Sequence, residues 1–114
     1  MQASNLARRI VDLLSDRQAE DIILLDISRV ASFADYFVIA SAVNPRHMGA
    51  LLETLEKDLA PEDVHPPHQE GTAESGWVLL DFGDLIVHLF SPEERSYYDL
   101  EGLWSHGVAV VRIQ

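Results

Sequence analysis

Three aspartates lie beside apolar runs of the chain, a position in which carboxylates can bind a metal ion. Asp26 lies near the end of the run 22–27, and Asp81 and Asp84 flank a Phe-Gly-Asp turn between two later runs. Clustered carboxylates can hold Mg²⁺, as in a metal-dependent nucleotidyltransferase or hydrolase. Aspartate is also a favoured turn residue, because its side chain bonds to nearby backbone. A nucleotidyltransferase would need a glycine-rich loop to bind phosphate, but after the second apolar run the first glycine is Gly49. The turn role is therefore favoured, and catalysis is the alternative.

The histidines give little support to a metal site. His65 and His68 are separated by two prolines, which hold this stretch extended and keep the two rings from converging. The chain has no cysteine to supply a third ligand, so we predict no metal and no cofactor. His88, with Ile86 and Phe90 pointing the same way, suits either a core position or an interface. No Ser-His-Asp arrangement occurs, and we predict that the protein is not an enzyme.

Aromatic side chains are concentrated between residues 77 and 104, as expected of a surface that grips another macromolecule. Tryptophan, tyrosine and arginine dominate binding hot spots because they combine a large buried area with a polar group. Trp77 and Tyr98, with Arg95 nearby, are the strongest interface candidates. A helical stripe that we expect to pack on a sheet is formed by Tyr97, Leu100 and Trp104.

The composition indicates one folded domain over residues 1–114, with an acidic surface. The formal net charge is −11, which argues against nucleic acid and favours a basic protein partner, although solubility alone would also account for it. No run is long enough to span a membrane, and no signal peptide is recognisable, so the expected location is the cytoplasm.

The hydrophobic pattern predicts an α/β (α+β) fold in the order α-β-β-α-β-β-α-β, with a single mixed sheet of about five strands and flanking helices. The first helix is expected to be capped by Ser4, and the second by Asn44 before Pro45. A third helix should run from a Ser91 cap to Gly102. Residues 60–76 read as a loop. The expected strands are 22–27, 36–42, a hairpin of 77–82 and 85–90, and 108–113.

Three blocks of the sequence resemble the ribosomal silencing factor family, also called Iojap-like. They are DIILLDIS at 21–28, FADYFVIASA at 33–42 with the following Arg46-His47, and the long block 77–104. The last is the most specific, with WVLLDFGDLIVHLF followed by R-x-Y-Y-x-L-E-x-L-W. Together the blocks extend over about two-thirds of the chain in the family's order.

The resemblance implies a nucleotidyltransferase-like sheet that lacks the enzyme's active site. Proteins of this family dock on the large ribosomal subunit, against its fourteenth-numbered protein, and block joining with the small subunit. Translation is thereby damped when nutrients are scarce. The resemblance also implies a homodimer away from the ribosome.

Carried onto this sequence, the resemblance implies a docking surface on the hairpin and the helix that follows it. Its residues are Trp77, Asp81, Asp84, His88, Arg95, Tyr98, Leu100, Leu103 and Trp104. This chain departs from the family at 42–45, where Ala-Val-Asn-Pro replaces a Gly-Asn-Ser-like turn. The tail 105–114 also extends beyond shorter relatives, and its apolar run is expected to be covered, either in the sheet or by a second copy.

Overall fold

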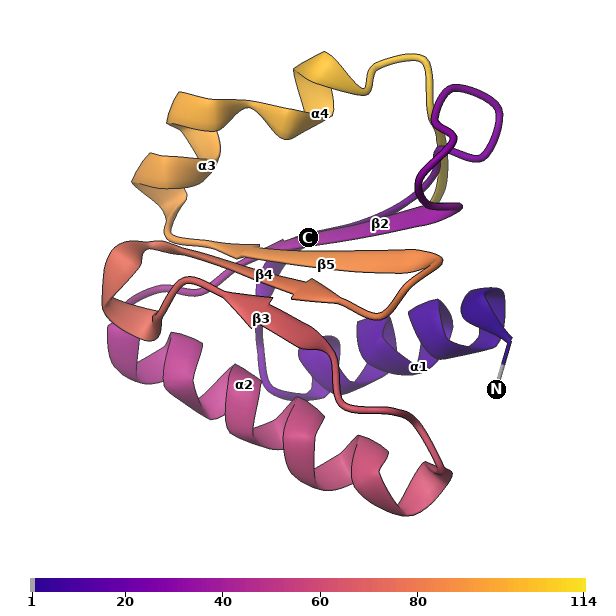
Figure 1. Ribbon diagram of the computed structural model, residues 1–114. Helices are drawn as coiled ribbons and strands as arrows, with labels where there is room; N and C mark the ends of the chain where they lie inside the picture. The colour runs from indigo at the N-terminus through magenta and orange to yellow at the C-terminus, as the bar shows by residue number, and fades with distance from the viewer. Residues whose placement is uncertain (1) are drawn as a thin grey trace.

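A single six-stranded sheet with helices on both faces organises the chain in the computed structural model, which describes residues 2–114 (Figure 1). The helices are α1 (Ala3–Asp16), α2 (Pro45–Leu59), α3 (Pro92–Tyr98) and α4 (Leu100–Leu103), with two short 3₁₀ turns at Ala60–Glu62 and Ala73–Ser75. The strands are β1 (Glu20–Asp26), β2 (Tyr36–Ser41), β3 (His68–Glu70), β4 (Trp77–Asp81), β5 (Leu85–Phe90) and β6 (Val108–Ile113). The predicted mixed α/β fold is therefore confirmed, with one strand more than expected.

The strands lie in the order β3-β4-β5-β2-β1-β6. Only the central pair β2–β5 is parallel, with Tyr36 opposite Leu85 and Ser41 opposite Phe90. The predicted hairpin is confirmed as the antiparallel pair β4–β5, in which Trp77 lies opposite Phe90. This register places the Phe-Gly-Asp turn at the end of the sheet where β2 begins.

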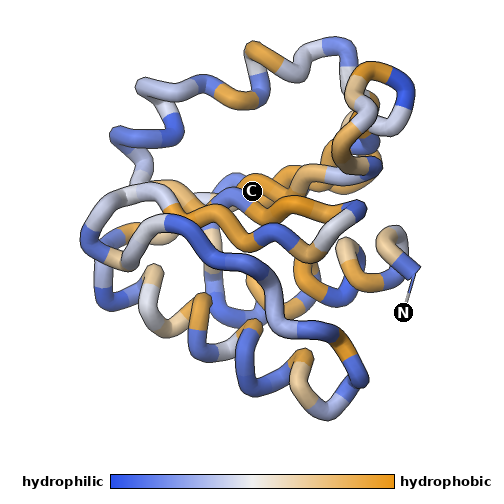
Figure 2. The backbone as a smooth tube through the Cα atoms, in the orientation of Figure 1, coloured by the Kyte–Doolittle hydropathy of each residue, from blue (hydrophilic) through white to orange (hydrophobic). Residues whose placement is uncertain are grey.

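The apolar runs of the central strands serve two cores, one on each face of the sheet. In β1, Ile22 and Leu24 belong to the core beneath α1 and α2, whereas Ile23 and Leu25 belong to the core beneath α4. Successive strand residues point to opposite faces, so a strand covered on both sides must be apolar throughout. Figure 2 shows these strands as a hydrophobic layer between more polar helices.

Two of the three predicted helix caps are confirmed. The side chain of Asn44 accepts a hydrogen bond from the His47 N–H over 2.8 Å, and Ser91 Oγ accepts one from the Glu94 N–H over 3.2 Å. The predicted Ser4 cap is wrong, because α1 already begins at Ala3, with Gln2 as an N-cap residue that makes no side-chain bond. The apolar face of α1 is nevertheless buried as expected.

The stretch 60–76 contains more structure than the predicted loop. His68–Glu70 pairs with β4 as an exposed edge strand, with Gln69 opposite Leu80. The strand carries no apolar alternation, so only the pairing with β4 defines it. Gly71 follows with φ +86°, a left-handed conformation that favours glycine.

The predicted helix 91–102 is interrupted at Asp99. This residue has φ +48°, in the left-handed region, and its side chain accepts a hydrogen bond from the Gly102 N–H over 3.3 Å. Aspartate tolerates this conformation because its short polar side chain bonds locally. The break separates α3 from α4 and changes which side chains face the sheet.

The tail strand β6 extends the sheet by pairing antiparallel with β1. The register shifts so that Val111 lies opposite Leu24 and Ala109 opposite Leu25, which leaves Val110 as a bulge. Val108 and Val110 are exposed, and no other element of residues 2–114 pairs with the outer side of β6. Within the described residues, no helix has the length and apolar character needed to cross a membrane.

Candidate partner-binding surface

The hairpin and the α3–α4 region place most of the predicted site residues on one face of the sheet. Alternation along the two strands directs every second side chain to that face. The cross-strand pairs on it are Trp77 with Phe90, Leu79 with His88, and Asp81 with Ile86. Because α3 and α4 lie over the same face (Figure 1), the strand and helix residues of the prediction come together.

Trp77 is the centre of an aromatic cluster. Its ring lies 5.0 Å from that of Phe90 and 4.5 Å from that of Tyr98, measured between centroids. Its Nε1–H donates to Nδ1 of His88 over 3.2 Å. The ring contacts and the hydrogen bond fix the orientation of the Trp77 indole and leave it half-buried. A binding anchor requires such a fixed, partly exposed aromatic side chain.

His88 lies beneath this cluster and is only 4 % exposed. Burial lowers the pKa of His88 to about 4, because the charged imidazolium loses its hydration. The ring is therefore neutral at pH 7, and since Nδ1 accepts from Trp77, the proton resides on Nε2. Nε2 is buried and has no hydrogen-bond partner among the described residues. His88 thus supports Trp77 from below.

The two tyrosines of α3 differ in what they contact. Tyr98, off the predicted stripe, contacts Trp77 and Phe90, whereas Tyr97, on the stripe, is 80 % exposed. The prediction that Tyr97 packs on the sheet is wrong, because the break at Asp99 ends the helical period that defined the stripe.

Beyond the break, α4 buries Leu100 and leaves Leu103 exposed. Leu100 is buried in the core beneath α4, and Leu103 is 73 % exposed. Trp104 packs edge-on against Phe33 and Phe37, at centroid distances of 5.6 and 5.4 Å. Half-buried Trp104 therefore borders the exposed ring of Phe33, and Leu103 adds a further exposed apolar side chain on α4.

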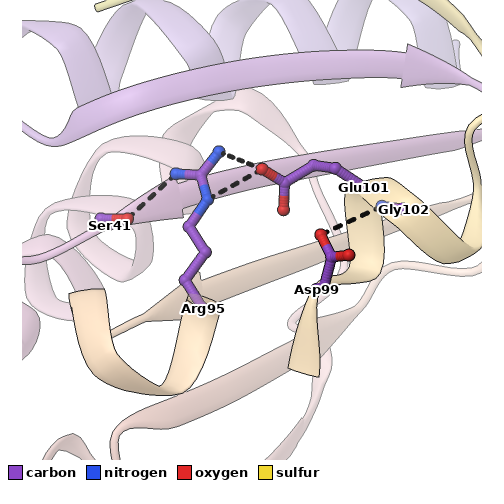
Figure 3. Close-up of polar contacts among 5 residues, drawn as sticks. All are labelled: Ser41, Arg95, Asp99, Glu101 and Gly102. Carbon is purple, nitrogen blue, oxygen red and sulfur yellow. Dashed lines mark hydrogen bonds and ion pairs between the residues drawn. The ribbon is translucent and has the colours of Figure 1, made fainter. Parts of the chain in front are cut away.

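Arg95 points into the protein, as Figure 3 shows. Its Nε and Nη2 both donate to Glu101 Oε2, over 3.1 and 3.0 Å, and its Nη1 donates to Ser41 Oγ over 2.9 Å. The side chain is only 12 % exposed. Three donors of the guanidinium fork are thus occupied within the chain.

The three aspartates of the catalytic alternative do not form one cluster. Asp81 Oδ1 accepts from the Gly83 N–H over 2.8 Å, a turn contact, and Asp84 is exposed beside it. Asp26 accepts from the side chain and backbone N–H of Ser28, which lower the pKa of its carboxyl. It lies on β1, three strand positions from β4, a separation of roughly 14 Å between backbones. No group of three potential metal-binding side chains occurs within residues 2–114.

The predicted site residues omit three apolar residues of this surface. Ile86, which is predicted to point the same way as His88, and Leu79 are half-buried on the same face, and the alternation of the hairpin would have added Leu79. Phe33 is 55 % exposed in the connector between β1 and β2, where no periodic pattern indicates its position.

Comparison with known proteins identifies the family. The family described as ribosomal silencing factor during starvation matches residues 1–113. A ribosomal silencing factor of Zymomonas mobilis is 39 % identical over 102 residues, covering 90 % of this chain and 77 % of the relative. The mouse mitochondrial assembly of ribosomal large subunit protein 1 is 34 % identical over 99 residues, covering 84 % of this chain and 43 % of the relative.

A crystal structure from Chromobacterium violaceum has the same fold. It superposes with a TM-score of 0.85 at 34 % identity, covering 92 % of this chain and 88 % of that chain. Sequence and structure thus agree over nearly the whole length. The chain belongs to the ribosomal silencing factor family.

Proposed function

We propose a specific form of the ribosome-associated silencing role that the family carries. The protein binds the large ribosomal subunit against its fourteenth-numbered protein and sterically prevents the small subunit from joining, which damps translation under nutrient limitation. The family description names silencing during starvation, and the name of the mouse relative refers to the large subunit. The observation that carries the proposal is the partly exposed aromatic surface around Trp77.

The chemistry of that surface suits a basic protein partner. Trp77 and Tyr98 supply aromatic area that is held rigid by their mutual contact, so little side-chain entropy is lost on binding. Asp81 lies on the same face, and exposed Asp84 lies in the hairpin turn next to it. The net charge of −11 favours encounter with basic ribosomal proteins and opposes contact with bare rRNA.

The predicted site residues divide into those that reach solvent and those beneath the surface. Trp77, Tyr98, Leu103 and Trp104 are at least partly exposed, together with Asp81 and Asp84, and they form the direct contact. His88, Arg95 and Leu100 point into the protein and support these residues. Steric exclusion needs placement and affinity but no bond chemistry, so the protein acts without catalysis.

Away from the ribosome the protein forms a homodimer in the cytoplasm. The outer side of β6, with Val108 and Val110 exposed, offers one place for a second copy. The bulge at Val110 and the charge of Arg112 disfavour open-ended strand addition there. A closed pair of subunits, with no further growth, is the expected form.

Co-sedimentation with isolated ribosomal subunits tests the proposal. Purified protein is mixed with large or small subunits and separated on a sucrose gradient, and the fraction of joined ribosomes is measured after the complementary subunit is added. The expected result is comigration with large subunits alone and fewer joined ribosomes. Comigration with neither subunit, or unchanged joining despite binding, would overturn it.

A further inference from the structure

The segment 92–104, here called the cover segment, has little structure of its own to hold it in place. It consists of α3, with seven residues, and α4, with four, joined through the left-handed Asp99. Isolated helices of this length are unstable in water, because too few hydrogen bonds offset the cost of nucleation. The position of the cover segment must therefore depend on contacts with the sheet.

Those contacts are few and come from side chains. Within residues 2–114, the backbone N–H groups of the cover segment bond only locally, as in Asp99 to Arg95 and Trp104 to Leu100. No residue of α3 is buried, and Leu100 is the one buried residue of α4. Apolar burial alone thus leaves the orientation of α3 weakly defined.

Arg95 supplies the missing constraint. Its guanidinium joins α3 to Ser41 at the end of β2 and to Glu101 in α4, so one side chain ties both helices and the sheet (Figure 3). The side-chain exposures are 12 % for Arg95 and 32 % for Glu101, so water screens the pair only in part. Glu101 Oε1 is buried without a partner in the described part of the chain, so the carboxylate depends on Arg95.

We propose that Arg95 is a positioning residue for the partner-binding surface, holding the cover segment so that Tyr98 meets Trp77 and Trp104 meets Phe37. Its role is not direct contact with the partner, since the guanidinium is already engaged within the chain. A planar fork can reach Ser41 and Glu101 together, whereas a lysine ammonium would reach them only as a point charge. Only the expected loss of large-subunit binding rests on the proposed function; the structural role of Arg95 does not.

Amide hydrogen exchange and large-subunit binding, measured on the same variants, test the proposal. Arg95→Gln should raise the exchange rates of the Asp99 and Trp104 amides about tenfold or more, since a charge-assisted network is lost. Amides of the central strands, such as Val38 and Val87, should keep their rates. Affinity for the large subunit should fall about tenfold with the misplacement of Tyr98.

Two further variants serve as the conservative replacement, Arg95→Lys, and as the charge control, Arg8→Gln. The lysine variant should give intermediate exchange and intermediate affinity, because it keeps the charge and loses the fork. Arg8 is exposed on α1, on the opposite face, and its replacement removes the same charge with no expected effect on either measurement.

Three results would overturn the positioning role: unchanged exchange in Arg95→Gln, exchange raised equally in the central strands, or weakened binding with native exchange. The last would make Arg95 a direct contact. If the wild-type protein does not bind large subunits, the proposed function fails, and the exchange rates alone decide whether Arg95 holds the cover segment.

Discussion

The indole of Trp77 is hydrogen-bonded to the imidazole of His88, with 3.2 Å between Nε1 and Nδ1. This bond requires that Nδ1 carry no proton: the pKa of about 4 leaves the buried ring neutral at pH 7, and the bond itself favours the form with its one proton on Nε2. The partly exposed indole of Trp77, a candidate for partner binding, therefore depends on the protonation state of a side chain that is itself buried.

The first prediction concerns acid. In the unfolded chain His88 takes up a proton near its ordinary pKa of 6.5, but in the fold only near 4. The unfolded state thus binds more protons between these values, and the free energy of unfolding should fall by roughly 3 kcal/mol as the pH drops from 6.5 to 4. The stability that neutral His88 contributes is present above pH 6.5, and below pH 4 it decreases no further.

Urea denaturation at a series of pH values checks the prediction. His88→Leu should remove most of the pH dependence between 6.5 and 4, although the variant is less stable because the indole N–H loses its acceptor. His68→Gln, which replaces an exposed histidine on β3, is the control and should keep the wild-type slope. An equal slope in wild type and His88→Leu would assign the effect to other groups.

The second prediction concerns the aromatic anchor. Tyr98→Ala should weaken binding to the large subunit by about 2 kcal/mol, because it removes ring area and leaves Trp77 less constrained. Tyr97→Ala is the matched control, since Tyr97 is the adjacent tyrosine, is 80 % exposed and does not contact Trp77. Affinities from sedimentation at fixed salt decide, and an equal or larger loss for Tyr97→Ala would place the hot spot elsewhere.

The third prediction concerns charge at the hairpin turn. Asp84→Lys should slow association with the large subunit roughly tenfold at low salt, because a rim charge acts mainly on encounter. Asp12 is exposed on α1, on the opposite face of the sheet. Asp12→Lys makes the same change in net charge and should slow association much less. Stopped-flow association at two salt concentrations separates the two. Equal slowing would mean that only net charge matters.

The fourth prediction compares two glycines. An alanine Cβ at Gly71 would clash with the Trp77 carbonyl oxygen, at a φ of +86°, so Gly71→Ala should cost roughly 3 kcal/mol of stability. Gly49 lies inside α2 with open space around a built Cβ, so Gly49→Ala should stabilise by about 1 kcal/mol. Thermal unfolding of both variants is the measurement, and a stable Gly71→Ala protein would contradict the close approach.

Most of the fold could be predicted because its signals are local. The hairpin, the apolar face of α1 and the caps at Asn44 and Ser91 each depend on neighbours within a few residues. β3 could not be predicted, because a polar three-residue strand forms only by pairing with β4. The break at Asp99 could not be predicted either, because the sequence on both sides of it continues a helical pattern.

The sequence indicated candidate residues for the site but not the directions of their side chains. Trp77 and Tyr98, the interface candidates, lie partly at the surface and touch. For His88 and Arg95, residue type alone did not show that both point inward. Strand alternation places His88 on this face, but the burial of both side chains follows from the cover segment lying over the same face, a tertiary arrangement that no short pattern encodes.

The sheet order has a consequence for the growing chain. β2 finds its parallel neighbour only when β5 has been synthesised, and the outer side of β1 stays open until β6 arrives. During translation the apolar run Ile22–Leu25 is therefore left without one of its strand neighbours until the segments between β1 and β6 have been made. Such late pairing slows folding and exposes nascent chains to aggregation. The sheet of this member of a ribosomal silencing family is thus completed only after β6, which lies far from β1 in the sequence, has been synthesised.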